Sequence, residues 1–447
     1  MAFAATGSGV TTVGDLDGNF KEVYADKLVD LRPRSLRFLT DIKYLPKDKS
    51  PGNSYHQPVQ LQHEHGFTYA GKDAGAFELN EPIVGATKDA TVVGFQTLLR
   101  SRMDYETAAR ASSAGQRAFV QATKLMTREM TLGFRKRCEL DMINGRQGIG
   151  EVKAVGDNFV EIEPKAWIPG AWAGAEGAEV EFWDGATYTG DGTADDGRSP
   201  GDDTANTVTA AVITKVDFTS KKIYFDASQF DVDDGTDGVE VGDKVFFKGA
   251  RAATGEWKIP PGIRDILLLG SAGSGSLFGI DVGNYSLWQA HKHEIPGDGA
   301  ALDFAAVNKA IVGTVNKGLE ENVCLYITPN TWADLISEEA VQRRWPSHNG
   351  DRYKVGAEDI EFYSQHGTVK IKTSLYMPES EGIMIAPQLW NIVGATDMTF
   401  NLPGRGDSFF LHTPENAGFE LRAYKNSACF TEAPGKSTLI TNIVNSL

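Results

Sequence analysis

The clearest pattern of hydrophobic and polar positions lies between Ser101 and Gly145, a stretch without proline. Apolar residues recur there at steps of three and four, which places them on one face of an α-helix. These residues are Phe119, Ala122, Met126, Met130, Phe134, Cys138 and Met142. The pattern predicts one long helix, which would span roughly 60 Å at ~1.5 Å per residue. A compact domain of this size does not need so long a helix, so we interpret it as a strut.

The stretch before this helix, from Leu45 to Phe95, is rich in proline and glycine, which separate short extended pieces such as Val59–His63. A loosely structured stretch of roughly 50 residues is uncommon inside one globule. We therefore predict a projecting two-stranded arm that packs on another subunit. Further upstream, Asp15–Asp30 has the pattern of a short amphipathic helix, which Pro33 would end.

Residues 151–257 show no helical pattern and consist of short β-rich runs broken by Gly/Asp turns. The predicted strands are Glu151–Val155, Phe159–Ile162, Ala178–Trp183, Thr207–Val216, Lys222–Phe225 and Lys244–Phe247. Glycine- and alanine-rich stretches flank the segment at Gly148–Gly150 and Ala252–Gly255. We interpret the segment as an inserted β-domain, a barrel or a sandwich.

The chain after Pro260–Pro261 is mixed α/β in pattern. Apolar residues at helical spacing predict a helix over Phe304–Leu319, with Asp303 as its N-cap. The apolar run Val323–Ile327 predicts a central strand, and Thr331–Glu339 predicts a further helix. The strands predicted after these are Ile360–Tyr363, Val369–Thr373, Gly382–Ile385, Phe409–His412, Phe419–Tyr424, Ala428–Thr431 and Thr438–Ile443.

Composition places the chain among globular proteins. It has 447 residues, 41% of them apolar, enough for two to four units with a core each. The 60 acidic against 44 basic residues give a net charge of −16, which disfavours a general affinity for nucleic acid. The three cysteines are far apart in sequence and are expected to be buried, reduced thiols. We also expect no membrane span and no secretory signal at the N-terminus.

Motifs for catalysis or metal binding are absent from the sequence. It has no phosphate-binding loop, nucleophile elbow or zinc-ligand motif, which argues against an enzyme. His291, His293 and Glu294 could contribute metal ligands from one strand, but no third ligand type lies nearby, which favours a solvated face. The acidic run Asp231–Gly238 fails the EF-hand spacing because its twelfth position is Gly242. We assign no catalytic, cofactor-binding or metal-binding residue and expect no cofactor.

Two other local features have a simple structural interpretation. Arg405–Ser408 matches an integrin-binding tetrapeptide, but its place between Pro403 and a predicted strand favours a turn. The basic residues of the long helix can pair with carboxylates such as Glu129 and Glu139, or they can make weak, sequence-independent contact with nucleic acid or with a partner protein. Those basic residues are Arg128, Arg135, Lys136 and Arg137.

The order of these elements resembles the major capsid proteins of tailed double-stranded DNA bacteriophages, the Hong Kong 97-type capsid fold. Val323–Trp332 looks like that family's strand followed by a helix that begins at asparagine or proline. Gly356–Pro387 is similar to its β-hairpin and following strand, and Ala428–Ile443 to its last strand pair. The resemblance covers most of the chain outside 151–257 and lies in the order of the segments, since none is a strict signature.

The resemblance implies an α+β phage major capsid fold with a β-sheet peripheral domain, an α/β axial domain and an inserted all-β domain. The implied boundaries are an N-terminal arm at 1–44, an extended two-stranded loop at 45–100, a spine helix of the peripheral domain at 101–150, the inserted β-domain at 151–257, a return to the peripheral domain at 258–303, the axial domain at 304–402 and C-terminal strands of the peripheral domain at 403–447. Some members of the family crosslink subunits through a Lys–Asn isopeptide bond. Lys72 and Lys88 are candidate donors here, although we prefer no crosslink.

The function implied is structural: a non-enzymatic capsid subunit that assembles with itself into the hexamers and pentamers of an icosahedral head. The arm would bury apolar side chains such as Phe67, Tyr69 and Phe77 against a neighbour. Implied partners are scaffolding, portal and cement proteins, with weak, non-specific contact to packaged double-stranded DNA and no membrane. The subunit would assemble in the host cytoplasm and reside in the virion. Two alternatives remain open, an encapsulin-type nanocompartment and a β-rich phage surface or tail component.

Overall fold

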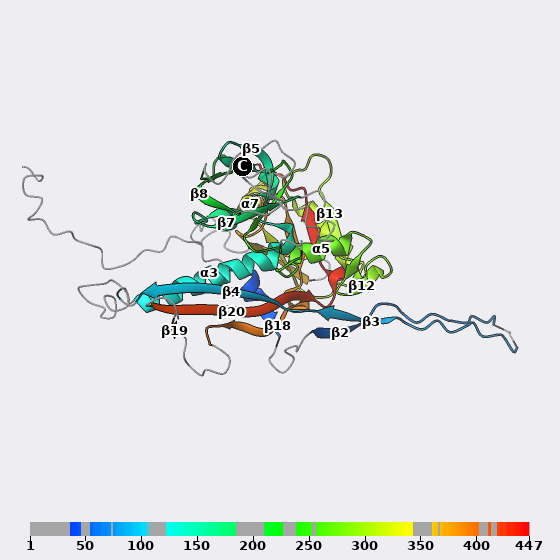
Figure 1. The fold of residues 1–447 in the computed structure, drawn as a ribbon. Coiled ribbons are helices and arrows are strands. Elements are labelled where there is room, and N and C mark those ends of the chain that lie inside the picture. Colours follow the sequence, from blue (N-terminus) through cyan, green and yellow to red (C-terminus); the bar gives the residue numbers. More distant parts are fainter. Residues whose placement is uncertain are drawn as a thin grey trace, which may run out of the picture.

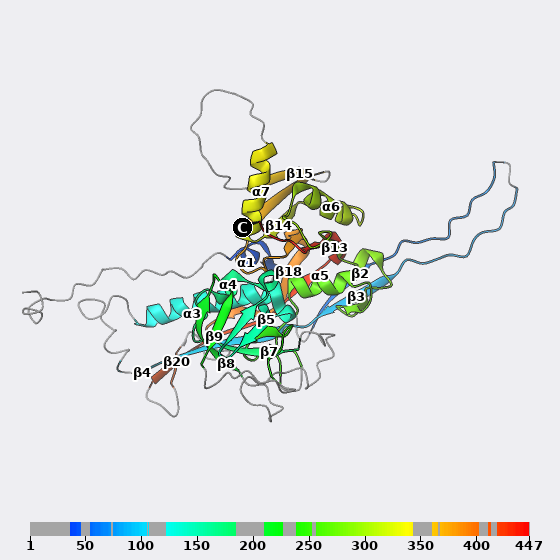
Figure 2. The same cartoon turned by 90° about the horizontal axis from the view of Figure 1, so that it is seen from above.

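The chain is organised as a long sheet under one helix, a second sheet with its own helices, and a closed barrel (Figures 1 and 2). The computed structural model describes residues 36–45, 54–72, 75–104, 106, 122–184, 210–226, 238–252, 256–342, 360–364, 367–401, 410–412 and 418–446. The predicted helix Asp15–Asp30 lies outside these residues.

The central strand of the long sheet is β20 (Gly418–Thr431). On one edge it pairs antiparallel with all ten residues of β4 (Phe95–Asp104). On the other edge it pairs antiparallel with β18 (Trp390–Thr399) and β19 (Phe410–His412). The short strand β1 (Lys43–Tyr44) adds parallel to β18. Among the described strands β4 pairs with β20 alone, so its second edge has no backbone partner there.

The long helix is α3 (Ala122–Asn144), 23 residues that lie along the sheet (Figure 1). The apolar stripe that the periodicity predicts packs on β20, with Met126 at the margin of the contact. The fully buried residues of this contact are Met130, Phe134, Leu421 and Ala423. Phe119, the first residue of the predicted stripe, lies outside the described residues. Burial of this stripe therefore fixes the helix to the sheet.

The prediction that the helix starts at Ser101 is wrong, because Ser101–Asp104 ends strand β4. Exposure alternates residue by residue along the whole of β4, which is the period of a strand with one covered face. The helical stripe begins only at Phe119, so the absence of proline between the two elements does not make them one helix. The 23 described helical residues span about 35 Å at 1.5 Å per residue.

Six strands close into the barrel in the order β10–β5–β6–β9–β8–β7. Their bounds are β5 Gly150–Gly156, β6 Phe159–Ile162, β7 Glu179–Trp183, β8 Ala211–Asp217, β9 Lys222–Phe225 and β10 Lys244–Phe247. Buried side chains alternate with more exposed ones along β6 and β9, as expected of strands with one face inside a closed sheet. The inward side chains include Val152, Val160, Ile162, Val180, Phe182, Ile213, Ile223, Phe225 and Val245.

The barrel segment contains short helical turns that the pattern did not predict: η4 (Pro164–Ala166) and α4 (Pro169–Trp172). Each starts at a proline, whose fixed φ suits the first helical position. A single turn is too short to show a helical period, so sequence periodicity could not reveal it. At Gly170 an added Cβ would lie 2.7 Å from the Leu375 carbonyl oxygen, so only glycine fits this close approach.

The second sheet has the order β13–β21–β17–β14–β16–β15. Its strands are β13 His291–Glu294, β14 Val323–Ile327, β15 Ile360–Ser364, β16 Gly367–Thr373, β17 Gly382–Ile385 and β21 Thr438–Thr441. Helices α6 (Phe304–Val315) and α7 (Pro329–Gln342) share a core with it. As predicted, Asp303 caps α6: its Oδ1 accepts a hydrogen bond of 2.6 Å from the Ala306 backbone N–H.

Several elements lack a clear signal in the sequence. Helix α5 (Ile263–Ser271) is nine residues long, which is shorter than the stretch of about 11–18 residues in which a helical period is recognised. The others are only a few residues long: α1 Phe38–Asp41, β11 Ser276–Leu277, β12 Ile280–Asp281, η3 Gly145–Gln147, η6 Ser286–Trp288, η7 Pro387–Leu389 and η8 Pro434–Lys436. None of the described helices is long and apolar enough to cross a membrane.

Helix α1 joins α3 to the second sheet. The buried Glu139 of α3 accepts hydrogen bonds of 2.8 Å from two backbone N–H groups at the start of α1. At the other end of α1, Asp41 accepts hydrogen bonds from Tyr326 Oη at 2.5 Å and from Lys372 Nζ at 2.7 Å. Burial raises the pKa of Glu139, although the backbone N–H groups lower it in part. Glu139 therefore anchors α1 rather than pairing with the basic residues of its own helix.

The loop between β16 and β17 joins the second sheet to the barrel and to α5. Lys221 of the barrel lies 2.7 Å from Glu379 of this loop. Arg264 of α5 donates two hydrogen bonds of 2.6 Å to Glu381. A third contact, from Arg264 Nη1 to Asn144 Oδ1 at 3.1 Å, reaches the end of α3. The three units are thus linked through one short loop.

Candidate assembly surfaces

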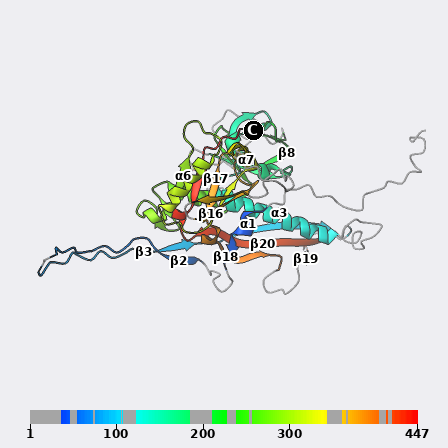
Figure 3. The same cartoon turned by 180° about the vertical axis from the view of Figure 1, so that it is seen from behind.

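A two-stranded extension, residues 54–92, projects from the edge of the body (Figures 1 and 3). Its root is the antiparallel pair β2 (Tyr55–Gln60) and β3 (Thr87–Val92). The Tyr55 and Phe278 rings each pack on Phe430, with centroids 5.8 Å and 5.1 Å away, and Ala90 is fully buried. The root is therefore held by the core of the molecule.

Beyond the root, the two segments of the extension continue side by side without forming regular strands. Leu61 N donates to Ala86 O at 2.8 Å, and His65 and Ile83 exchange backbone hydrogen bonds of 2.9 Å and 2.7 Å. Farther out, the Asn80 side chain donates to the Phe67 carbonyl at 2.7 Å. These contacts hold the outer part as a ribbon that touches only itself in Figure 2.

The outer ribbon exposes large apolar side chains. Tyr69 is 90% exposed and Leu79 is 78% exposed, so the described part of the chain leaves both largely uncovered. The full set is Phe67, Tyr69, Phe77, Leu79, Ile83 and Val84. The ribbon also carries the carboxylates Glu64, Glu78 and Glu81, against Lys72 as its basic residue among those described. A contiguous apolar surface of this kind is typical of a protein–protein contact.

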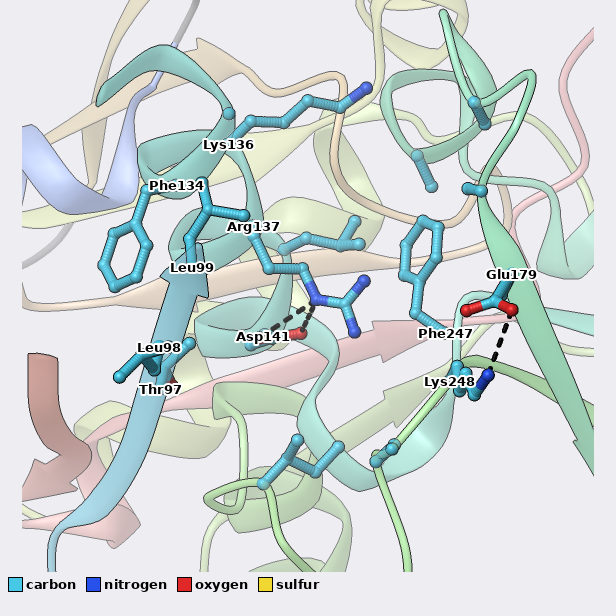
Figure 4. Close-up of a pocket in the computed structure, with 18 of the residues that line it drawn as sticks. Thr97, Leu98, Leu99, Phe134, Lys136, Arg137, Asp141, Glu179, Phe247 and Lys248 are labelled. Atoms are coloured by element: carbon cyan, nitrogen blue, oxygen red, sulfur yellow. Dashed lines mark hydrogen bonds and ion pairs between the residues drawn. The ribbon is translucent and has the colours of Figure 1, made fainter. Parts of the chain in front are cut away.

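A groove of about 680 Å³ lies between β4, α3 and the barrel. Leu99 of β4 and Phe247 of the barrel line it from two sides (Figure 4). The groove also carries four basic side chains, Lys136, Arg137, Lys248 and Lys258, and two acidic ones, Asp141 and Glu179. It is therefore mainly apolar with an excess of positive charge, and it runs beside the edge of β4 that has no strand partner among the described residues.

The basic residues predicted on α3 have different surroundings. Arg137 pairs with Asp141 at 3.1 Å and lies 4.0 Å from the centre of the Phe247 ring. Lys136 donates a hydrogen bond of 2.8 Å to the Ala173 carbonyl of the barrel. Arg135 is exposed, as is Arg128. Two of these four residues thus connect α3 to the barrel, and neither pairs with Glu139.

The residues considered for metal binding do not form a site among those the structure describes. His291, His293 and Glu294 lie on β13, and their region has no group of three or more His, Cys, Asp or Glu side chains in the described part of the chain. Burial lowers the pKa of both histidines. The acidic run at 231–237 and the segment Arg405–Ser408 lie outside the described residues.

The remaining candidates are on the surface or in the core. Lys72 and Lys88 are exposed on the extension. Cys324 and Cys429 are buried, Cys138 is partly buried, and the three are free thiols. Burial raises the pKa of Cys138 to about 11 and that of Cys429 to about 12, so both stay protonated at neutral pH.

Sequence reasoning missed part of these surfaces. The exposed set includes Leu79, Ile83 and Val84, which lie among polar residues, Pro82 and Gly85 and show no period that marks a surface. The groove depends on three segments that are distant in sequence, and no local pattern could reveal it.

No family model and no curated protein matches this sequence. Among solved structures, the chain is similar to the capsid asymmetric unit of cyanophage A-1(L), with a TM-score of 0.52 and 10% identity over 97% of this chain and 99% of that chain. A structure from Mycobacterium phage Adephagia has a TM-score of 0.47 and 10% identity over 98% and 100%. The encapsulin complex of Synechococcus elongatus has a TM-score of 0.43 and 7% identity over 98% of this chain and 98% of that chain. The first similarity shows a shared fold along nearly the whole of both chains.

Proposed function

We propose that this chain, which has the fold of a phage major capsid protein, is the shell subunit of an icosahedral head that encloses double-stranded DNA. The observation that carries this proposal is the outer ribbon, an ordered structure with large apolar side chains that its own chain does not cover. A monomer gains nothing from that exposure, whereas a shell subunit uses it for contact with its neighbours.

The ribbon would lie across a neighbouring copy. Burying a large apolar side chain contributes about 1.5–3 kcal/mol, so six of them supply on the order of 10 kcal/mol before the cost of ordering. A head-to-tail contact of this kind closes into rings, as hexamers and pentamers require. The groove beside β4 is the surface that suits the ribbon, because its apolar lining and excess of basic side chains complement apolar groups and the three glutamates.

The units of the fold take distinct roles in this proposal. The long sheet with α3 is the peripheral domain, and the second sheet with α6 and α7 is the axial domain that meets its copies at the centre of each capsomer. The barrel is an insertion that packs on α3 and on the loop between β16 and β17. Scaffolding, portal and cement proteins are the expected partners, and contact with packaged DNA is weak and independent of sequence.

Electron microscopy of the purified protein tests the assembly. We expect closed shells, or rings and tubes made of the same capsomers, with or without a scaffold. A protein that stays monomeric under every condition would overturn the proposal. A nanocompartment subunit would also form shells, so the content of particles isolated from infected cells decides between the two: nuclease-protected double-stranded DNA is expected here, and a protein cargo would contradict it.

Variants of the ribbon separate folding from assembly. Replacing Phe67, Tyr69 and Leu79 with serine should leave the melting temperature unchanged within a few degrees, because these side chains are exposed in the subunit. The same variant should no longer form shells. A matched control replaces Val241 and Phe218, which are also exposed but lie on the barrel segment, and it should assemble normally. Normal assembly of the ribbon variant would contradict the role given to the ribbon.

A further inference from the structure

A cluster of arginines occupies the face of the long sheet that points away from α3. Along β4 and β20, one set of alternate residues packs on α3 through Leu421 and Ala423. The other set includes Arg100 and Arg102 of β4 and Arg422 of β20. In the pairing of the two strands Arg100 lies opposite Arg422, and Arg102 lies opposite Glu420. Directly paired residues share a face of the sheet, so the four side chains are neighbours.

One carboxylate holds the three guanidinium groups. The Nε atoms of Arg422, Arg100 and Arg102 lie 2.5, 3.0 and 3.2 Å from Glu420 oxygens. The Glu420 side chain is 4% exposed, whereas the arginines are 45%, 43% and 53% exposed. Each contact uses Nε, and a guanidinium carries four further N–H donors on its two Nη groups. Glu420 therefore orients three cations whose outer parts face solvent.

This cluster differs in charge from the rest of the molecule. The chain as a whole carries −16, yet the charged residues on this face of the two strands are three arginines against Glu420 and Asp104, which is +3 − 2 = +1. Arg100 and Arg102 are two residues apart on one strand, so their side chains emerge roughly 7 Å from each other. The result is a short row of cations on a flat surface.

We propose that this arginine face binds the phosphate backbone of double-stranded nucleic acid, so that it is the inner, DNA-facing surface of the shell. The proposal rests on the proposed function for the identity of the nucleic acid. Arginine matches phosphate because its planar N–H groups form two parallel hydrogen bonds with two phosphate oxygens. The face has no base-reading pocket among its described residues, so binding is independent of sequence and sensitive to salt.

The ribbon of another copy is the competing ligand, because it carries glutamates. Its apolar side chains would need apolar partners, and on this face of β4 the large exposed one is Leu98. The phosphate backbone of a duplex presents negative charge at regular intervals and no apolar groups, so it fits the row of arginines better than the ribbon does. The groove beside β4, with its apolar lining, fits the ribbon better.

The test measures binding of a fluorescent 30-base-pair duplex of arbitrary sequence to the unassembled, full-length subunit by anisotropy, over a series of salt concentrations. The test variant is Arg100→Gln/Arg102→Gln. It leaves Arg422 paired with Glu420, so that the carboxylate keeps a cation. We expect weaker binding, with the slope of log K against log salt reduced by about two, one for each arginine–phosphate pair that the variant removes.

Two controls make this result specific. Lys124→Gln/Arg135→Gln removes two charges from exposed positions of α3 and should leave the slope unchanged. Arg100→Lys/Arg102→Lys keeps the charge and should retain the slope, with lower affinity because lysine offers no bidentate geometry. An unchanged slope in the Gln variant, or an equal reduction in the α3 control, would overturn the proposal. So would Arg-dependent binding of a peptide of residues 61–85 in place of the duplex.

Failure here is distinguishable from failure of the proposed function. If the protein forms shells but the Gln variant binds the duplex as the parent does, the arginine face is not the DNA surface and the shell assignment stands. If no shells form, the shell assignment fails whatever the binding assay shows. Thermal melting of the Gln variant, expected within a few degrees of the parent, shows that weaker binding does not come from unfolding.

Discussion

Replacing Glu381 with Gln tests whether the loop between β16 and β17 fixes the relative placement of the units. Glu381 receives two hydrogen bonds of 2.6 Å from Arg264, and the two side chains are only 12% and 11% exposed. The Gln side chain has the same shape but offers one acceptor oxygen and no charge. Arg264 would then remain in a nearly buried site without its counter-charge.

The magnitude follows from that burial. Removing one partner of a buried ion pair costs about 3–5 kcal/mol, and the slight exposure here places Glu381→Gln near 3 kcal/mol. Arg264→Met should cost about 3 kcal/mol for the same reason, since it leaves Glu381 unpaired. Removing both charges in Arg264→Met/Glu381→Gln leaves neither member of the pair buried without the other, and we expect about 3 kcal/mol rather than the sum of about 6. The coupling energy is therefore about 3 kcal/mol.

Urea unfolding of the unassembled subunit, followed by tryptophan fluorescence, measures these values as shifts in midpoint at constant slope. The pair Lys248 and Glu179 is the matched control, with an N–O distance of 3.0 Å but side chains 53% and 46% exposed. Its coupling should stay below about 1 kcal/mol. A cost under about 1 kcal/mol for Glu381→Gln, or a double variant that costs the full sum, would refute the reasoning.

Three further predictions concern other contacts. Phe134→Ala should cost about 3–5 kcal/mol by thermal unfolding, since Phe134 is buried between α3 and β20, whereas Phe218→Ala, half exposed on the barrel, should cost under about 1 kcal/mol. Leu79→Cys/Leu99→Cys should form disulfide-linked chains on oxidation of shells, and either single variant should not, because Leu99 lines the groove. Equal crosslinking of the single variants would argue against binding of the ribbon in the groove. Burial raises the pKa of Glu139, so the folded protein binds a proton at this carboxyl more tightly than the unfolded chain does. The stability gained from this proton is fully present below pH ~4.3 and is lost as the pH rises through the pKa of the folded state. Glu139→Gln should therefore flatten this part of the plot of melting temperature against pH.

The sequence could predict elements whose period is regular and whose bounds are marked. Strands Phe159–Ile162, Lys222–Phe225, Val323–Ile327 and Gly382–Ile385 occur at the predicted residues. The packing of the α3 stripe on β20 also follows from its period, because an apolar face must be covered. These features depend on local signals, which a single sequence contains in full.

Other features depend on contacts between distant residues. The local pattern predicts a helix-surface charge at Glu139, yet this residue is buried because α1, about a hundred residues earlier, places two backbone N–H groups against it. Strand β18 carries glycine and polar residues and is recognisable only through its pairing with β20. The arginine face likewise requires the register of β4 on β20, because Arg100 and Arg422 are over 300 residues apart in the sequence.

Two features of the chain are explained by the contact between copies that we propose. The ribbon keeps Tyr69 and Leu79 in water, which lowers solubility unless they are later buried. The second edge of β4, ten residues long, has no strand partner among the described residues, although proteins that remain monomeric usually shorten or cover such an edge. The edge lies beside the groove whose charge complements the ribbon. One contact between copies would therefore cover both surfaces, and the net charge of −16 would keep the free subunits apart until the ribbon is seated.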